Sequence, residues 1–208
     1  LIMANQIKTI GQLCTPRKSV FVRSRKDVVF NISDLLSGEF EEKEARTFFE
    51  ENYVTNGLKQ LVEKTFDRLT SKKDQAATYL LSQAMGGGKT HSMIALGLLA
   101  RYPALRKEFW KDSDLGTDEI RVMGFDGRES DYGFGVWGAL AEQVGNKELF
   151  SDLYSPLQAP GVTSWINLLK GPPTVILLDE LPPYFANAMS KSIGSSNLAA
   201  VTTTAISN

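Results

Sequence analysis

Apolar residues along the chain form short continuous runs that alternate with stretches of helical spacing. Three runs of strand length predict buried β-strands at residues 77–82, 120–125 and 175–178. Gly171-Pro172-Pro173 precedes the third run and Leu181-Pro182-Pro183 follows it, so chain breakers bound a strand that is apolar on both faces. Strands that alternate with helices predict an α/β fold, with a parallel sheet and helices on both of its faces.

Helical spacing of the apolar residues accounts for most of the remaining chain. The predicted helices cover residues 41–51, 58–69, 89–101, 135–144, 162–170 and 197–207. Thr55-Asn56 can cap the second of these helices. Residues 150–160 are predicted to form an irregular loop, and the serine-rich residues 190–197 favour a flexible linker.

Residues 16–30 alternate apolar and basic side chains, which predicts one or two extended pieces with a cationic outer face. That face is either solvated or in contact with a nucleic-acid backbone, and the acidic residues within 39–44 favour the solvated alternative. We therefore divide the chain into an amino-terminal extension over residues 1–70, made of an extended arm and helices, and a core over residues 71–208.

A glycine-rich segment lies where the first predicted strand meets a helix, and it reads Gln83-Ala84-Met85-Gly86-Gly87-Gly88-Lys89-Thr90. Glycines accept positive φ and turn backbone N–H groups inward, so an anion can bind there and at the positive end of the helix dipole. We expect Lys89 to reach the β- and γ-phosphates of a nucleotide, and Thr90 to offer its hydroxyl to Mg²⁺. The predicted nucleotide-binding residues are Ala84, Met85, Gly86, Gly87, Gly88, Lys89, Thr90 and His91.

This segment departs from the pattern G-x-x-x-x-G-K-[ST] at its first position, where Gln83 stands in place of glycine. In that respect it resembles superfamily-two helicases and some other P-loop branches. The alternative, a glycine-rich turn followed by a chance Lys-Thr pair, does not account for the flanking strand and helix. His91, the single histidine, is interpreted as a packed helix residue and not as a catalytic base.

Two acids follow the third predicted strand. Asp179 emerges at the carboxyl end of that strand, where open α/β sheets bind ligands. We expect Asp179 to hold a water on Mg²⁺, and Glu180 to orient or deprotonate the water that attacks the γ-phosphate. An Asp-Glu pair otherwise often caps a helix, but the glycine-rich segment favours the catalytic interpretation. Lys89 and Glu180 are thus the predicted catalytic residues, and Thr90 and Asp179 the predicted metal ligands.

The second predicted strand also ends in polar residues. Asp126 and Arg128 come off the same carboxyl edge of the sheet, on either side of Gly127. They face a substrate or a neighbouring subunit, or they simply make the turn, as polar residues beside a glycine usually do.

The composition excludes several kinds of metal site and catalytic site. With 208 residues, 42% of them hydrophobic, the chain can bury a large core, and a formal charge of −1 gives no general attraction to nucleic acid or membranes. A single cysteine, Cys14, excludes an internal disulfide and a cysteine-based zinc site, and one histidine argues against a Ser-His-Asp triad. Mg²⁺ is the metal we expect. No stretch approaches the roughly 20 apolar residues of a membrane span, so we expect no membrane contact and a cytoplasmic location.

P-loop ATPases of the additional-strand type place one more strand between the phosphate-loop strand and the metal-carboxylate strand, after a helix. Residues 197–207 fit that helix, and no strand follows it before Asn208. The predicted fold is therefore a P-loop NTPase of this type that is incomplete at its carboxyl end, without the sensor strand and any arginine finger. Activity of this fragment is expected to be weak or absent.

Four segments of the chain carry a family resemblance: Phe48-Phe49, Tyr53-Val54-Thr55-Asn56-Gly57-Leu58, Ala84-Met85-Gly86-Gly87-Gly88-Lys89-Thr90-His91 and Leu177-Leu178-Asp179-Glu180-Leu181-Pro182-Pro183-Tyr184. Together they resemble the amino-terminal part of the large bacterial ATPases of the domain-of-unknown-function-499 family. The resemblance implies that the chain is an amino-terminal fragment of such a protein. It further implies an association with phage defence, in which neighbouring proteins include a DNA methyltransferase-like protein and a helicase.

We therefore expect an ATP-binding and ATP-hydrolysing module of a larger bacterial protein, with ATP and Mg²⁺ as cofactors, acting in phage defence or another DNA-related process. DNA and a methyltransferase-like protein are the partners that the resemblance implies, through regions beyond these residues, and a homo-oligomer is a further expectation. Two alternatives stay open. One is a helicase-type DNA translocase, suggested by Gln83 and the acid pair, and the other is a nucleotide-gated scaffold that hardly hydrolyses ATP.

Overall fold

The structure is a computed structural model that describes residues 9–16, 21, 31–38, 40–70, 77–82, 86–111, 113–128, 133–155 and 157–208. The extended pieces predicted over residues 16–30 fall almost entirely outside the described residues. The same holds for three residues of the glycine-rich segment, Gln83, Ala84 and Met85. A short helix, α1 (Ile10–Leu13), precedes the main body of the molecule.

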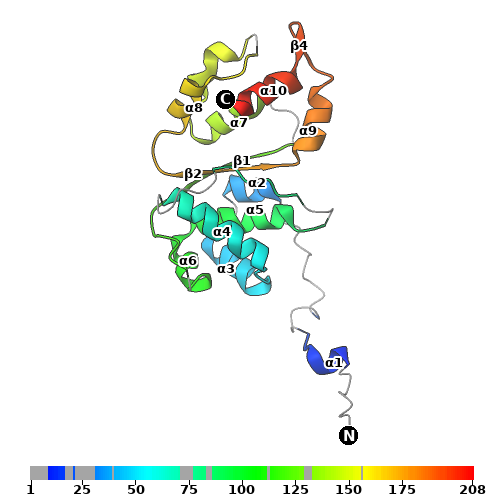
Figure 1. Cartoon of the computed structure of the whole chain (residues 1–208), viewed down its shortest axis with the longest axis vertical. Helices are drawn as coiled ribbons and strands as arrows, with labels where there is room; N and C mark the ends of the chain where they lie inside the picture. The colour runs from blue at the N-terminus through cyan, green and yellow to red at the C-terminus, as the bar shows by residue number, and fades with distance from the viewer. Residues whose placement is uncertain are drawn as a thin grey trace.

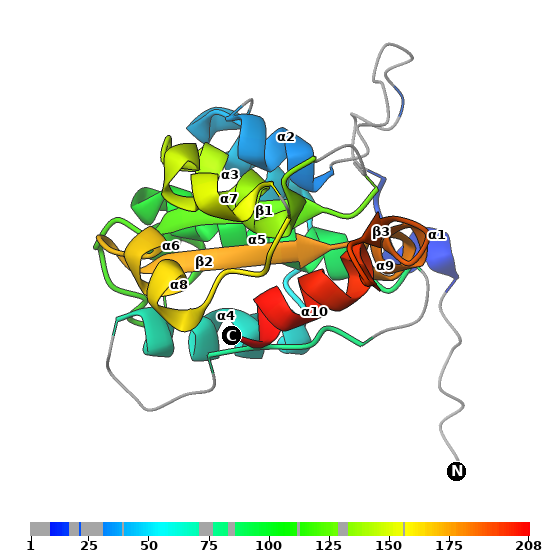
Figure 2. The same cartoon turned by 90° about the horizontal axis from the view of Figure 1, so that it is seen from above.

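Two parallel strands form the centre of the molecule. Strand β1 (Arg121–Asp126) pairs with β2 (Thr174–Asp179) in a register that runs from Arg121 opposite Thr174 to Asp126 opposite Asp179. Figure 2 shows the two strands side by side. The strands predicted at 120–125 and 175–178 are confirmed, and so is their parallel pairing; Val175 and Leu177 are buried as predicted, whereas Ile176 and Leu178 are half-buried. Because both strands run in the same direction, Asp126 and Asp179 end at one edge of the sheet.

The side chains of β2 alternate between two apolar clusters, one on each face of the sheet. Val175 and Leu177 belong to the first cluster, whereas Ile176 and Leu178 pack against the second. Figure 1 shows the two sets of helices separated by the strands. The first cluster holds α2 (Ile32–Ser37), α3 (Glu42–Glu51), α4 (Asn56–Leu69), α5 (Lys89–Arg101) and α6 (Pro103–Phe109). The second holds α7 (Gly135–Gln143), the 3₁₀ helix η2 (Lys147–Leu153), α8 (Val162–Leu168), α9 (Leu181–Ala188) and α10 (Leu198–Ser207).

Six of these helices, α3, α4, α5, α7, α8 and α10, confirm the helical spacing of the sequence. Two of the six have a side-chain cap: in α4 the Thr55 hydroxyl accepts a hydrogen bond from the backbone N–H of Leu58 at 3.2 Å, and in α10 the Asn197 side chain accepts one from the N–H of Ala200 at 3.0 Å. Helix α9 corrects one prediction, because Leu181-Pro182-Pro183 begins this helix and does not only break the chain. Proline costs nothing in the first turn of a helix, where the backbone N–H has no acceptor within the helix.

Residues 77–82, all of which are described, do not form the predicted strand. They are not paired with β1 or β2, and Leu80 is 90% exposed. The prediction was wrong because an apolar run becomes a strand only where a neighbouring backbone accepts and donates its hydrogen bonds. In its place, residues 77–81 and all of β2 line a single cavity of about 2510 Å³.

Residues 190–197 are not a flexible linker. They contain two short antiparallel strands, β3 (Ser192–Ile193) and β4 (Ser196–Asn197), joined by a two-residue turn in which Gly194 has φ +57°. Positive φ in such a turn matches the twist of the strands, and serine is compatible with both strand and linker. The loop predicted at 150–160 is also more ordered than expected, because η2 extends to Leu153.

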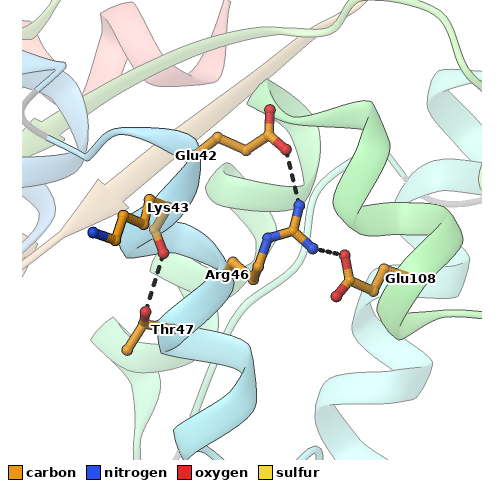
Figure 3. A network of polar contacts seen from close by, with 5 residues as sticks. All are labelled: Glu42, Lys43, Arg46, Thr47 and Glu108. Atoms are coloured by element: carbon orange, nitrogen blue, oxygen red, sulfur yellow. Dashed lines mark hydrogen bonds and ion pairs between the residues drawn. The ribbon is translucent and has the colours of Figure 1, made fainter.

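Helix α2 packs on α5, and α3 and α4 share the first apolar cluster with it. Arg46 of α3 lies between Glu42 of the same helix, at 3.1 Å, and Glu108 of α6, with which it also pairs (Figure 3). The apolar cluster thus runs across residue 70, where the sequence suggested a boundary, and the division into two parts stays a prediction. In the described ranges, no helix is both long and apolar enough to cross a membrane.

Candidate functional site

The glycine-rich segment leads directly into α5. Gly86 and Gly88 have φ of +76° and +80°, and Gly88 in this left-handed conformation is the residue before the first helical position, Lys89. An L-residue is strained in such a conformation, which explains why glycines precede the helix. The first turn of α5 therefore presents its backbone N–H groups at the end of the loop, and Gly86, Gly87, Gly88, Lys89, Thr90 and His91 all line the cavity.

The carboxyl end of β2 meets this first turn. The hydroxyl of Thr90 donates a hydrogen bond to Oδ2 of Asp179 at 2.5 Å, although the two residues are 89 positions apart. The other carboxylate oxygen of Asp179, Oδ1, accepts from the backbone N–H of Glu180 at 2.9 Å. The structure thus brings together Thr90 and Asp179, the two predicted metal ligands, and Asp179 and Glu180 line the same cavity as Lys89.

Glu180 has an unusual backbone conformation. Its φ and ψ are +50° and +35°, and among the described residues it is the single non-glycine residue with positive φ. Strained backbone of this kind is retained where the surrounding structure determines it, and it is frequent at functional sites. Glu180 lies directly before α9, so the strain falls at the junction between the strand end and the helix.

Residue Gly127 allows β1 to pass close to Glu180. A Cβ atom at Gly127 would lie 2.1 Å from the backbone oxygen of Glu180, so no larger residue fits without movement of the backbone. The N–H of Gly127 donates to the backbone oxygen of Asp179 at 2.9 Å and extends the strand pairing by one bond. The two strand ends are therefore held together where the acid pair emerges.

Arg128, the next residue, forms an ion pair that the sequence did not predict. Its Nη2 donates to Oε1 of Glu180 at 2.5 Å. Its backbone N–H donates to Oδ1 of Asp126 at 2.9 Å, which confirms that Asp126 makes the turn. No local pattern could have shown the pair, because it depends on the register of β1 against β2: Arg128 lies two positions beyond Asp126, and Glu180 one position beyond the paired Asp179.

The ring of His91 stacks on Phe48 of α3, with ring centroids 4.5 Å apart and an interplanar angle of 26°. Burial lowers the pKa of His91 below its usual value, which favours the neutral imidazole. The interpretation of His91 as a packed helix residue is confirmed. The stacking also ties α3 to the first turn of α5, beside the glycine-rich segment.

The donor set at the meeting point of α5 and β2 fits Mg²⁺ in kind. A hydroxyl and a carboxylate are hard oxygen donors, and Mg²⁺ keeps several waters while it takes one or two protein ligands. Within the described part of the chain, no group of three or more His, Cys, Asp and Glu side chains is gathered around a point that could hold a metal. A two-ligand site that shares its ion with a phosphate is the arrangement these residues can support.

Comparison with protein families assigns the chain. The family model described as the DUF499 N-terminal domain matches residues 17–120, half of the 208 residues. The chain belongs to the DUF499 family. The DUF499 match contains the glycine-rich segment and all of α5, and it ends before β1, so Asp179 and Glu180 lie beyond it. No curated protein and no solved structure matches the chain significantly.

Proposed function

We propose that this chain is an ATP-binding and ATP-hydrolysing module with a P-loop NTPase fold of the additional-strand type. The observation that carries the proposal is the 2.5 Å contact between Thr90 and Asp179, because it joins the helix after the glycine-rich segment to the strand end that bears the acids. A hydroxyl after Gly-Lys and a carboxylate at the end of a parallel strand are the pair that this class of enzyme uses for its metal.

The surroundings of β2 support the additional-strand arrangement. Among the described residues β2 is paired with β1 alone, and all six of its residues line the cavity that residues 77–81 also line. Helices cover both faces of the sheet, one apolar cluster on each face. A further strand would form hydrogen bonds with the backbone N–H and C=O groups on the edge of β2 that does not face β1. Such a strand would lie between β2 and residues 77–81.

Each residue of the candidate site has a separate role in the proposed hydrolysis of ATP. Backbone N–H groups of Gly86 to Thr90 and the ammonium group of Lys89 bind the phosphates, and Thr90 and Asp179 would hold Mg²⁺, which neutralises phosphate charge when bound. Glu180 orients a water and accepts its proton. The water oxygen bonds to the γ-phosphorus while the bond from that phosphorus to the β–γ bridging oxygen breaks, and the bridging electron pair leaves with ADP.

Asp179→Asn tests the metal half of the site. The change removes one charge and keeps the shape of the side chain, so we expect MgATP binding to weaken roughly 10- to 100-fold, the range seen when a residue that supports a metal is lost. Binding of ATP in the presence of a chelator should change little. Calorimetry on both proteins, with and without Mg²⁺, measures the two effects, and Asp152→Asn on the exposed surface of η2 is the matched control. Wild-type protein that takes up no MgATP would contradict the proposal.

Glu180→Gln tests the catalytic half. We expect MgATP to bind as before and phosphate release to fall roughly 100-fold or more, since a positioned general base contributes at least that factor. A phosphate-release assay on the larger protein to which we assign the chain measures turnover, and Glu148→Gln, an exposed change in η2, is the control. Undiminished turnover in the Glu180→Gln protein would remove this residue from its role.

The same assay separates the proposal from its alternatives. Stimulation by duplex DNA would favour a helicase-type translocase, and MgATP binding without turnover would favour a nucleotide-gated scaffold. We further propose that the activity belongs to a larger bacterial protein in phage defence or another DNA-related process, the setting that the resemblance stated in the sequence analysis implies.

A further inference from the structure

The ion pair between Arg128 and Glu180 occupies the group that the proposed reaction needs. Oε1 of Glu180 accepts a hydrogen bond from Arg128 at 2.5 Å, in a structure whose cavity is lined by both residues and by the glycine-rich segment. A charge-assisted hydrogen bond of this length fixes the direction of the carboxylate. While it lasts, the guanidinium engages one of the two carboxylate oxygens and holds the group toward Arg128, so the carboxylate is less free to turn to a water.

Backbone contacts fix the two strand ends from which the side chains of the pair extend. Asp126 and Gly127 hold the backbone before Arg128 through bonds of 2.9 Å, one to the N–H of Arg128 and one to the backbone oxygen of Asp179. Gly127 brings β1 against the Glu180 backbone, where a Cβ would clash at 2.1 Å. Glu180, with its strained φ, thus lies with its backbone directly against Gly127, the residue before Arg128.

The side chains of Arg128 and Glu180 differ in their exposure to solvent. That of Arg128 is 71% exposed, whereas that of Glu180 is 31% exposed. An exposed arginine can leave its partner at small cost, because solvent screens the pair and a long side chain gains rotamer freedom on release. The pair can therefore open without any change in the fold.

We propose that Arg128 is a positioning residue that holds Glu180 in a resting arrangement and limits the basal rate of hydrolysis. Turnover is then faster when the ion pair is open, because both oxygens of the carboxylate are free to orient and deprotonate water. This inference deepens the proposed function and rests on it. It gives the chain a restraint on ATP use that a partner or a phosphate group could release by offering Arg128 another anion.

The test is the turnover of Arg128→Ala in the larger protein to which the chain is assigned. We expect kcat to rise roughly two- to five-fold, the factor that corresponds to a partly exposed ion pair. The KM for MgATP should stay within a factor of two of the wild-type value, on the order of experimental scatter for an unchanged binding step. Arg128→Lys keeps the charge and should stay close to the wild-type rate. Arg101→Ala, at the far end of α5, is the matched control.

A merely structural role cannot produce this result, because damage to the fold lowers the rate and does not raise it. Arg128→Ala combined with Glu180→Gln should show no gain over Glu180→Gln alone, since the restrained group is then absent. A kcat for Arg128→Ala that is unchanged or lower overturns the inference. So does a selective loss of ATP affinity over ADP affinity, which would assign Arg128 to the γ-phosphate.

Calorimetry with MgATP distinguishes a failure of this inference from a failure of the proposed function. If wild-type protein binds MgATP, releases phosphate and shows no gain on Arg128→Ala, the restraint is wrong and the ATPase assignment stands. If wild-type protein takes up no MgATP, both fail together.

Discussion

Lys89→Ala is expected to remove measurable MgATP binding. The ammonium group is the one side-chain cation at the first position of α5, directly after the left-handed Gly88, where a bound triphosphate would carry its charge. Hydrogen bonds to charged groups contribute about 1.5–3 kcal/mol each, so the loss of two of them weakens binding by at least about 100-fold. Calorimetry with MgATP measures the effect directly.

The control for Lys89→Ala is Lys107→Ala, an exposed lysine of α6 that does not line the cavity. Both proteins should melt within about 1 °C of each other, as surface changes have small effects on stability. Lys89→Arg keeps the charge but replaces a compact ammonium by a planar fork, so we expect it to bind MgATP less tightly than wild type. Equal affinity of Lys89→Ala and wild type would place the phosphates elsewhere.

The sequence predicted the boundaries of those helices and strands that depend on the residues at their ends. The first turn of α5 begins where the glycines end, and β2 begins and ends at the breakers around it, because these boundaries depend on backbone preferences of single residues. The strand predicted at 77–82 shows the limit of such reasoning. Its apolar run was visible, but whether a run becomes a strand is decided by a neighbour that the run itself does not specify.

In the candidate site, too, local patterns predicted some residues and could not predict others. Thr90 and Asp179 could be predicted because each follows a local pattern, one after glycines and one at a strand end. Arg128 could not, since its contact with Glu180 depends on the register of β1 against β2 and on the unusual φ of Glu180. The register between the two strands, which the 47 residues 127–173 separate, cannot be predicted from a single sequence.

The stability of α5 is expected to depend most on a residue far from the cavity, the buried Arg106. This side chain is 2% exposed and lies over the ring of Phe66, with the guanidinium carbon 4.8 Å from the ring centroid. Nε and Nη2 donate to the backbone oxygens of Leu99 and Ala100 in the last turn of α5, each at 2.6 Å. Nη1 donates to the backbone oxygen of Asp118 at 3.0 Å.

These bonds satisfy carbonyls that a helix end leaves without partners, and they place a positive charge at the negative end of the α5 dipole. They also fix the segment that leads into β1. Burial lowers the pKa of Arg106, yet arginine begins so high that the guanidinium keeps its charge in the folded protein. The helix that begins at the glycine-rich segment is thus closed at its other end by one side chain.

Arg106→Met is expected to lower the free energy of unfolding by about 3–5 kcal/mol, because methionine fills much of the space and leaves the buried carbonyls unpaired. Chemical denaturation of the variant and of wild type measures the difference. Lys107→Ala, one residue along the same helix but exposed, should change stability by less than about 0.5 kcal/mol. A loss below about 1 kcal/mol in Arg106→Met would mean that water or backbone shifts satisfy these carbonyls, and that Arg106 does not hold the end of α5.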